Sequence, residues 1–233
     1  MLKIVDTEVP VACWSCSAEH PGSALFCPHC GKIQPAVASD YFRAFNLVRG
    51  FQIDLPALET EFHRLSRKLH PDRFARASEQ ERGWSLAGSS LLNDAYRTLK
   101  DPLARTEYLL KLEGAEIGEE NAGRDRKGQK DPSRVPADLL EEVFELNMQL
   151  EEMRMARMSG EKDSSLQSDL KLARVRFEGL LAAVNDDLRA QWNVWDAGDE
   201  AARAAAQKTM VALLDRRRYL SNLVRDVTET LGA

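Results

Sequence analysis

The sequence predicts an all-α protein that follows a small metal-binding module. All four cysteines lie between Cys13 and Cys30. Beyond residue 40, apolar side chains recur at intervals of three and four, the period of an amphipathic helix. Residues 115–135 carry almost no large apolar side chains, which divides the helical part in two. We therefore expect a metal module at 1–36, a helical domain at 37–114, a flexible linker at 115–135 and a helical bundle at 136–233.

The bulk composition excludes several classes of function. The 233 residues carry a formal net charge of -5, so they offer no overall positive field for nucleic acid or an anionic membrane. Apolar runs are too short for a membrane span, and the opening MLKIVDTEVP lacks the pattern of a signal peptide. We expect a cytoplasmic protein that binds neither nucleic acid nor membrane.

The cysteines form two closely spaced pairs, CWSC and CPHC, separated by ten residues. Each pair can close a tight turn that points two thiolates at one ion, and four thiolates suit tetrahedral zinc or iron. We favour structural zinc bound by Cys13, Cys16, Cys27 and Cys30, because no feature of an electron-transfer protein occurs elsewhere. Two disulfides, or iron bound as in rubredoxin, are the alternatives.

Four cysteines complete the ligand set of such a site, so we expect His20 and His29 on the surface. A module of this size cannot fold on an apolar core alone, and metal binding should supply most of its folding energy. The short linker Ala36 to Ser39 should separate its core from that of the helices.

The helical domain opens with a short helix in YFRAFNLV, capped by Ser39 or Asp40. Asp54 can cap the next helix, whose apolar face is formed by Leu58, Phe62, Leu65 and Leu69. This helix must end at Leu69 or His70, because Pro71 disfavours a helical conformation in the residue before it. The first long helix therefore ends immediately before His70-Pro71-Asp72.

Two further helices complete this domain. One runs roughly from Ser78 to Leu99, and the second, LARTEYLLKL, follows Asp101-Pro102 and ends near Gly114.

In the C-terminal part, residues 136–233, three long apolar patterns are divided by Gly160 and Gly198. Three helices with short connections should form an antiparallel bundle.

Basic residues and the tripeptide form a candidate protein-binding site. Arg64, Arg67 and Lys68 lie three and four residues apart, so they form one stripe of the helix. Pro71 stops the helix, so Asp72 should be displayed in a loop where its carboxylate can accept an arginine fork. By itself the tripeptide is better explained as an ordinary turn on a solvated helix, because three residues recur by chance.

The surrounding sequence resembles one family closely. DYFRAFNL, LETEFHRLSRKLHPDRF and LNDAYRTLKDPLARTEYLLKLEG resemble the J-domain of the HscB family, co-chaperones of iron-sulfur cluster assembly. PADLLEEVFELNMQLEEM and MVALLDRRRYL resemble its C-terminal bundle more loosely, and some members carry a four-cysteine module. The resemblance implies a J-domain helical hairpin, a C-terminal three-helix bundle and a zinc-ribbon-like module.

The resemblance also implies partners and roles. His70, Pro71 and Asp72 would contact a DnaK- or HscA-type chaperone ATPase, supported by Arg64, Arg67 and Lys68. The bundle would bind an IscU-type scaffold protein through five residues: Leu140, Phe144, Met148, Glu152 and Leu213. Core packing is the alternative role for these five.

The function implied is that of an adaptor without a catalytic centre, which delivers a scaffold to the chaperone and stimulates its ATPase. No phosphate-binding loop is present in the sequence. A general DnaJ-like co-chaperone and a rubredoxin-like electron carrier fused to a helical domain are the alternatives. A defined bundle in place of a Gly/Phe-rich region argues against the general co-chaperone.

Overall fold

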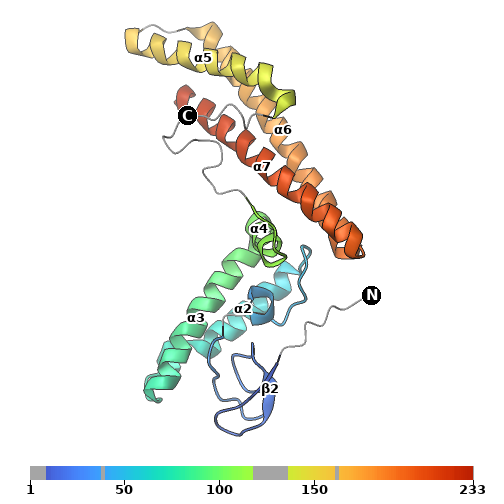
Figure 1. Ribbon diagram of the computed structural model, residues 1–233. Coiled ribbons are helices and arrows are strands. Elements are labelled where there is room, and N and C mark those ends of the chain that lie inside the picture. Colours follow the sequence, from blue (N-terminus) through green and yellow to red (C-terminus); the bar gives the residue numbers. More distant parts are fainter. Residues whose placement is uncertain (1–8, 38–39, 118–135, 161–162, 233) are drawn as a thin grey trace. The chain divides into compact units, whose positions relative to one another are not determined.

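The computed structural model describes residues 9–37, 40–117, 136–160 and 163–232. It divides the chain into two compact units, Met1–Leu109 and Leu110–Ala233 (Figure 1). The described residues are mostly helical beside one small sheet, which confirms the predicted fold class. Among the described residues, no helix combines the length and apolar character needed to cross a bilayer. Most of the predicted linker, residues 118–135, lies outside the described residues.

The N-terminal module of the first unit is built on a two-stranded antiparallel sheet. Strand β1 (Pro10–Ala12) pairs with β2 (Glu19–Pro21), with Val11 opposite His20. A single bridge joins Phe26 and Ile33 further along the chain. The small interior holds Leu25 and Ile33 beside the buried cysteines Cys13 and Cys27.

The helices of the first unit begin and end near the predicted residues. Helix α1 (Tyr41–Ala44) is capped by Asp40, which accepts a hydrogen bond from the Arg43 N–H. It is shorter than the predicted segment, because Asn46 takes a left-handed conformation with φ 54° and ends the turn. Helix α2 (Leu55–Leu69) is capped by Asp54 and ends immediately before His70, as Pro71 requires.

Helix α2 and helix α3 (Glu79–Lys100) form an antiparallel hairpin, since Phe62 stacks on Tyr96 while Leu69 meets Gly88. A Cβ atom on Gly88 would lie 3.1 Å from Leu69 Cδ2, so glycine lets the two helices approach closely here. Helix α4 (Pro102–Leu112) follows, and Gly114 with φ +79° ends it as predicted.

The second unit is an apolar helical bundle. A short 3₁₀ turn η3 (Ala137–Leu139) leads into α5 (Leu140–Ser159), α6 (Ser164–Ala197) and α7 (Glu200–Leu231). Gly160 and Gly198 lie in the turns, as predicted. The helices share a core that includes Leu146, Leu170, Val184 and Leu220. Helices α6 and α7 run antiparallel, as the hydrogen bonds from Arg203 to Trp195 O and from Arg217 to Asn185 require.

Candidate metal centre and partner-binding surfaces

The four cysteine thiols meet at one point in the module. Cys13 Sγ lies 3.7 Å from Cys30 Sγ, and Cys16 Sγ lies 3.7 Å from Cys27 Sγ. All four sulfurs lie within 4.8 Å of one another. Four sulfurs bound to one tetrahedral zinc at about 2.3 Å would be about 3.8 Å apart, whereas a disulfide needs about 2.05 Å. The spacing therefore fits a shared metal ion, and all four cysteines are free of disulfides.

The surroundings of Cys13 favour the thiolate, which is the form that binds metal. Desolvation raises the pKa of Cys13, but hydrogen bonds from the backbone N–H groups of Cys16 and Ser15 and from neighbouring thiols lower it to about 6. Gln34 Nε2 also donates to Cys13 Sγ at 3.3 Å. These donors stabilise negative charge on sulfur and hold the ligand in position.

His20 corrects the expectation that both histidines lie on the surface. It is only 4% exposed, because the alternation of β2 turns it toward the module interior. Its Nδ1 lies 2.8 Å from Pro21 O, and its Nε2 lies 3.2 Å from Gln34 Oε1. Through Gln34, His20 supports the sulfur cluster without belonging to it. His29 is exposed as expected.

The module packs against the helical hairpin, so the expectation of two separate cores is wrong. The rings of Trp14 and Trp84 lie 5.7 Å apart, and the Trp14 indole N–H donates to Ile33 O. Leu25 reaches the gap at Gly88, where α2 and α3 meet. The contacts of Trp14 with Trp84 and of Leu25 with Gly88 join residues about 60 to 70 positions apart, and no local pattern in the sequence could reveal them.

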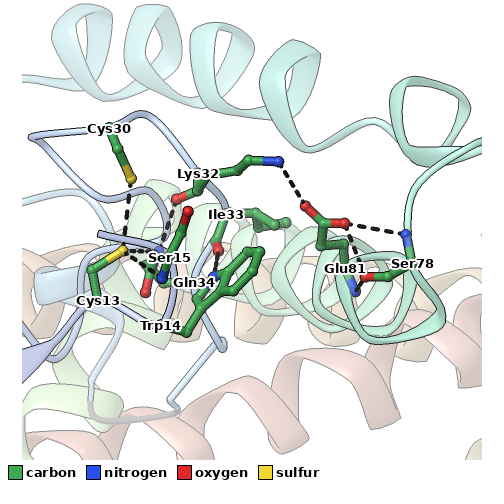
Figure 2. A network of polar contacts seen from close by, with 9 residues as sticks. All are labelled: Cys13, Trp14, Ser15, Cys30, Lys32, Ile33, Gln34, Ser78 and Glu81. Carbon is green, nitrogen blue, oxygen red and sulfur yellow. Dashed lines mark hydrogen bonds and ion pairs between the residues drawn. The ribbon is translucent and has the colours of Figure 1, made fainter. Parts of the chain in front are cut away.

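A polar network makes a second contact between module and hairpin (Figure 2). Lys32 Nζ lies 3.4 Å from Glu81 Oε1, and Glu81 also forms a reciprocal capping box with Ser78 at the start of α3. Glu81 accepts hydrogen bonds from Ser78, and these, followed by Lys32, lower the pKa of its carboxyl. One carboxylate thus caps α3 and holds the module.

The tripeptide forms a short 3₁₀ turn, η1 (Pro71–Phe74), in place of the predicted open loop. Backbone donors explain this: the Asp72 N–H donates to His70 Nδ1 at 3.3 Å, and the Arg73 N–H donates to His70 O at 2.9 Å. The Asp72 side chain is 90% exposed. The turn therefore fixes the backbone while leaving the carboxylate to solvent.

Buried hydroxyl groups hold the end of α2 beside this turn. Ser85 and Ser89 of α3 both donate to the carbonyl oxygen of Leu69. That carbonyl is one of the unpaired groups at the helix end, and Ser85 is fully buried. The position of the tripeptide is thus set by α3 as well as by Pro71.

The three predicted basic residues all lie on the exposed surface of α2. Arg64 makes a bidentate pair with Glu61, which cancels part of its charge. Lys68 Nζ lies 5.8 Å from the centre of the Phe26 ring, so the module touches the basic stripe. Sequence reasoning missed Phe26, because only the folded module brings it to α2.

The residues predicted to bind a scaffold divide into two groups. Leu140, Phe144 and Met148 are 51%, 68% and 59% exposed, which excludes core packing for these three, and Glu152 is exposed beside them. The spacing of four places all of them on one face of α5. Leu213 is half-buried and packs against the bundle core, while its neighbour Leu214 is fully buried.

The exposed apolar face of α5 continues beyond the predicted residues. Met155 and Met158 are exposed and follow Met148 by seven and ten positions, which keeps them on the same face. The same helical spacing could have revealed both in the sequence. We call Leu140, Phe144, Met148, Met155 and Met158 the α5 apolar stripe.

Comparisons with known proteins agree on the class. No protein-family model matches the chain. The iron-sulfur cluster co-chaperone protein HscB of Mus musculus is 35% identical over 163 residues, covering 68% of this chain and 65% of the relative. A co-chaperone protein HscB homolog of Aeromonas hydrophila is 34% identical over 140 residues, which span 52% of this chain and 81% of that protein. The chain thus spans slightly less than two thirds of its mouse relative.

Solved structures show the same similarity. The crystal structure of human co-chaperone protein HscB matches with a TM-score of 0.63 and 26% identity, covering 94% of this chain and 98% of that one. Chaperone HscB from Vibrio cholerae matches with a TM-score of 0.53 and 25% identity, covering 82% and 96% of the two chains.

A helical hairpin that presents His70-Pro71-Asp72 at the end of a basic helix is typical of a J-domain co-chaperone. The chain belongs to the HscB family of iron-sulfur cluster co-chaperones.

Proposed function

We propose that this protein is an adaptor that binds an IscU-type scaffold and delivers it to a DnaK- or HscA-type chaperone, whose ATPase it stimulates. The observation that carries this proposal is the Asp72 carboxylate, 90% exposed in a turn that Pro71, Ser85 and Ser89 hold in place. Because the backbone of this turn is fixed, little chain freedom is lost when the exposed carboxylate pairs with an arginine on a partner.

The basic stripe of α2 supports this role electrostatically. Arg67 and Lys68 are exposed close to His70, so they add positive charge beside the carboxylate. Mixed charges at the rim of an interface mainly speed the encounter and select the partner, whereas a buried charged contact sets the lifetime of the complex. We assign the encounter to the stripe and the durable contact to His70-Pro71-Asp72.

The α5 apolar stripe is the proposed scaffold-binding surface, with Glu152 at its edge. Large apolar side chains that line one helix face and remain exposed are typical of a helix-binding interface. Leu213 would act from the rim of the bundle core by supporting this surface. ATP hydrolysis then takes place on the chaperone, in the cytoplasm, and no catalytic residue is assigned to this chain.

The metal we propose is zinc in a structural role. Four cysteine ligands fill a tetrahedral site and leave no position open for a substrate. Bound zinc would cross-link the two CxxC turns and supply folding energy to a module whose interior holds few apolar side chains.

The test of this function is steady-state ATP hydrolysis by the cognate chaperone with an IscU-type scaffold present. The variant Asp72→Asn removes the charge and leaves the turn, so the fold should survive while binding weakens. Losing one partner of a charge-assisted contact costs about 2 to 5 kcal/mol, which at subsaturating concentration means a loss of more than about tenfold.

The matched control is Asp94→Asn on α3, a half-exposed carboxylate paired with Arg97. It should stimulate like the wild type. Undiminished stimulation by Asp72→Asn would reduce the tripeptide to an ordinary turn and refute the proposed function.

A further inference from the structure

A groove of about 690 Å³ lies between the four-cysteine module and α2. One wall comes from the module segment that contains Pro21, Ala24 and Phe26, and the other from α2 together with residues 43–46 at the end of α1. Arg73 and Phe74 also line it, and they directly follow Asp72 in the chain. The groove therefore adjoins the tripeptide proposed to contact the chaperone.

The groove combines positive charge with apolar surface. Arg64, Lys68 and Arg73 line it together with Glu61, whose carboxylate is already engaged by Arg64. Arg43 lines the groove too and pairs with Asp40, whereas the cationic groups of Lys68 and Arg73 lie on the exposed surface. Phe26, Leu65 and Phe74 add apolar surface between the charges. Such a lining complements a peptide that carries both carboxylates and apolar side chains.

The module wall has a defined shape. The Ala24 N–H donates to Pro21 O at 3.0 Å, and the Cys27 N–H donates to Lys32 O at 2.9 Å. Leu25, between these bonds, is buried next to Gly88 and so anchors the segment on the hairpin. The pair Cys27 and Cys30 closes the following turn at the sulfur cluster.

We propose that this groove binds an acidic, partly apolar segment of the same chaperone that His70-Pro71-Asp72 contacts, with the four-cysteine module forming half of the binding site. The inference rests on the proposed function. The chaperone is favoured as the source of the segment because Lys68, Arg73 and Phe74 flank the tripeptide on both sides. In this arrangement the metal module enlarges the chaperone-binding surface of α2.

Ala24 offers a test on the module wall, away from the residues already assigned to the chaperone. It is half-buried and lines the groove. Ala24→Glu places a carboxylate among the cations, Ala24→Gln has nearly the same size without charge, and Ala24→Lys reverses the charge. The affinity of each full-length variant for the cognate chaperone is measured by calorimetry with a non-hydrolysable ATP analogue.

We expect Ala24→Glu to weaken binding about fivefold relative to Ala24→Gln, the scale of one exposed charge interaction. Ala24→Lys should bind at least as tightly as Ala24→Gln. The difference between the Glu and Gln variants should shrink at high salt, because exposed charges are then screened. Metal content and circular dichroism confirm that each variant is folded.

Equal affinities of the Glu, Gln and Lys variants would overturn the proposal, whether or not all three are weakened. If Ala24→Glu does not fold, Pro21→Glu and Pro21→Gln repeat the comparison at an exposed lining residue. Asp72→Asn separates the two claims. If Asp72→Asn loses ATPase stimulation while the charge at position 24 has no effect on affinity, only the proposal for the groove is refuted. If Asp72→Asn stimulates fully, the proposed function itself is refuted.

Discussion

The two units of this protein present their candidate binding residues in opposite ways. In the first unit a single charged group, Asp72, projects from a turn. The Asp72 N–H donates to His70 Nδ1, and Ser85 of α3 donates to the Leu69 carbonyl oxygen just before the turn. In the second unit the candidate surface is a row of apolar side chains on α5, whose opposite face builds the core through Leu146 and Leu150. The first surface depends on the precise position of one group, and the second depends on apolar area.

The comparison extends to what holds each unit together. The module of the first unit relies on a sulfur cluster and on a few contacts with α3, including Trp14 with Trp84. The second unit relies on an apolar core that runs through three helices. Removing a metal should therefore damage the first unit, whereas removing an apolar side chain should damage the second.

The largest effect is expected from Cys13→Ser, which removes one of the four candidate metal ligands. The metal-binding free energy of a small structural site amounts to about 10 kcal/mol or more, so the module should unfold. Because it packs on α3, the hairpin should also lose stability. Metal analysis should give about one zinc per chain in the wild type and a colourless protein, since iron bound to four thiolates is red.

The matched control for Cys13→Ser is His29→Ala, which changes an exposed residue beside Cys30 and should keep the metal. A metal content near zero in reduced, freshly purified wild-type protein would contradict the metal site. An unchanged hairpin stability in Cys13→Ser would show that the module contacts contribute nothing to it.

In the second unit, Leu170→Ala should lower the free energy of unfolding by about 2 to 5 kcal/mol, because Leu170 is fully buried in the core. Phe144→Ala removes a larger side chain, yet it should change stability by no more than about 0.5 kcal/mol, because Phe144 is mostly exposed. Urea unfolding of the full chain measures both. Similar losses in the two variants would place Phe144 in the core and remove it from the candidate surface.

The double variant Phe144→Ala with Met148→Ala should weaken binding of an IscU-type scaffold about tenfold or more, because truncating apolar anchors commonly costs more than about 1 kcal/mol each. Calorimetry on the full chain is the measurement. Val175→Ala with Val194→Ala removes exposed apolar groups from α6 and serves as the control. Equal affinity of the double variant and the wild type would move the scaffold site away from the α5 apolar stripe.

The features that the sequence predicted well depend on local rules. Pro71 ends α2 at Leu69, the spacing of the cysteines brings four sulfurs together, and the period of α5 separates Phe144 from the core. Each of these follows from residues within a few turns of one another. The assignment of His70-Pro71-Asp72 to a chaperone and of the α5 apolar stripe to a scaffold stays a prediction.

The features that the sequence could not predict depend on contacts between distant residues. Two contacts join the module to α3: Trp14 packs on Trp84, and Lys32 pairs with Glu81. The sequence between module and helices suggested only a short linker that keeps them apart. The burial of His20 likewise depends on Gln34, which belongs to a later turn. Composition around Ala36 indicates chain flexibility, but it does not show which surfaces meet.

The smallest expected effect concerns Glu81, the carboxylate shared by the cap of α3 and the module. Hydrogen bonds from Ser78, followed by Lys32, lower its pKa in the folded protein. A carboxyl group with a depressed folded pKa contributes stability above its unfolded pKa, and this contribution is lost as pH falls through the folded pKa. Glu81→Gln should therefore destabilise the first unit at pH 7, and the difference from wild type should vanish under acidic conditions.

Thermal unfolding measured from pH 7 down to acidic pH tests the prediction at Glu81, with Glu79→Gln as the control. Glu79 lies in the same first turn of α3 but takes no part in the capping box. If Glu79→Gln and Glu81→Gln show the same pH dependence, the effect comes from the general interaction of carboxylates with the helix N-terminus. If only Glu81→Gln loses the pH dependence, the reciprocal cap and its contact with Lys32 carry it, and the two parts of the first unit share one stabilising group.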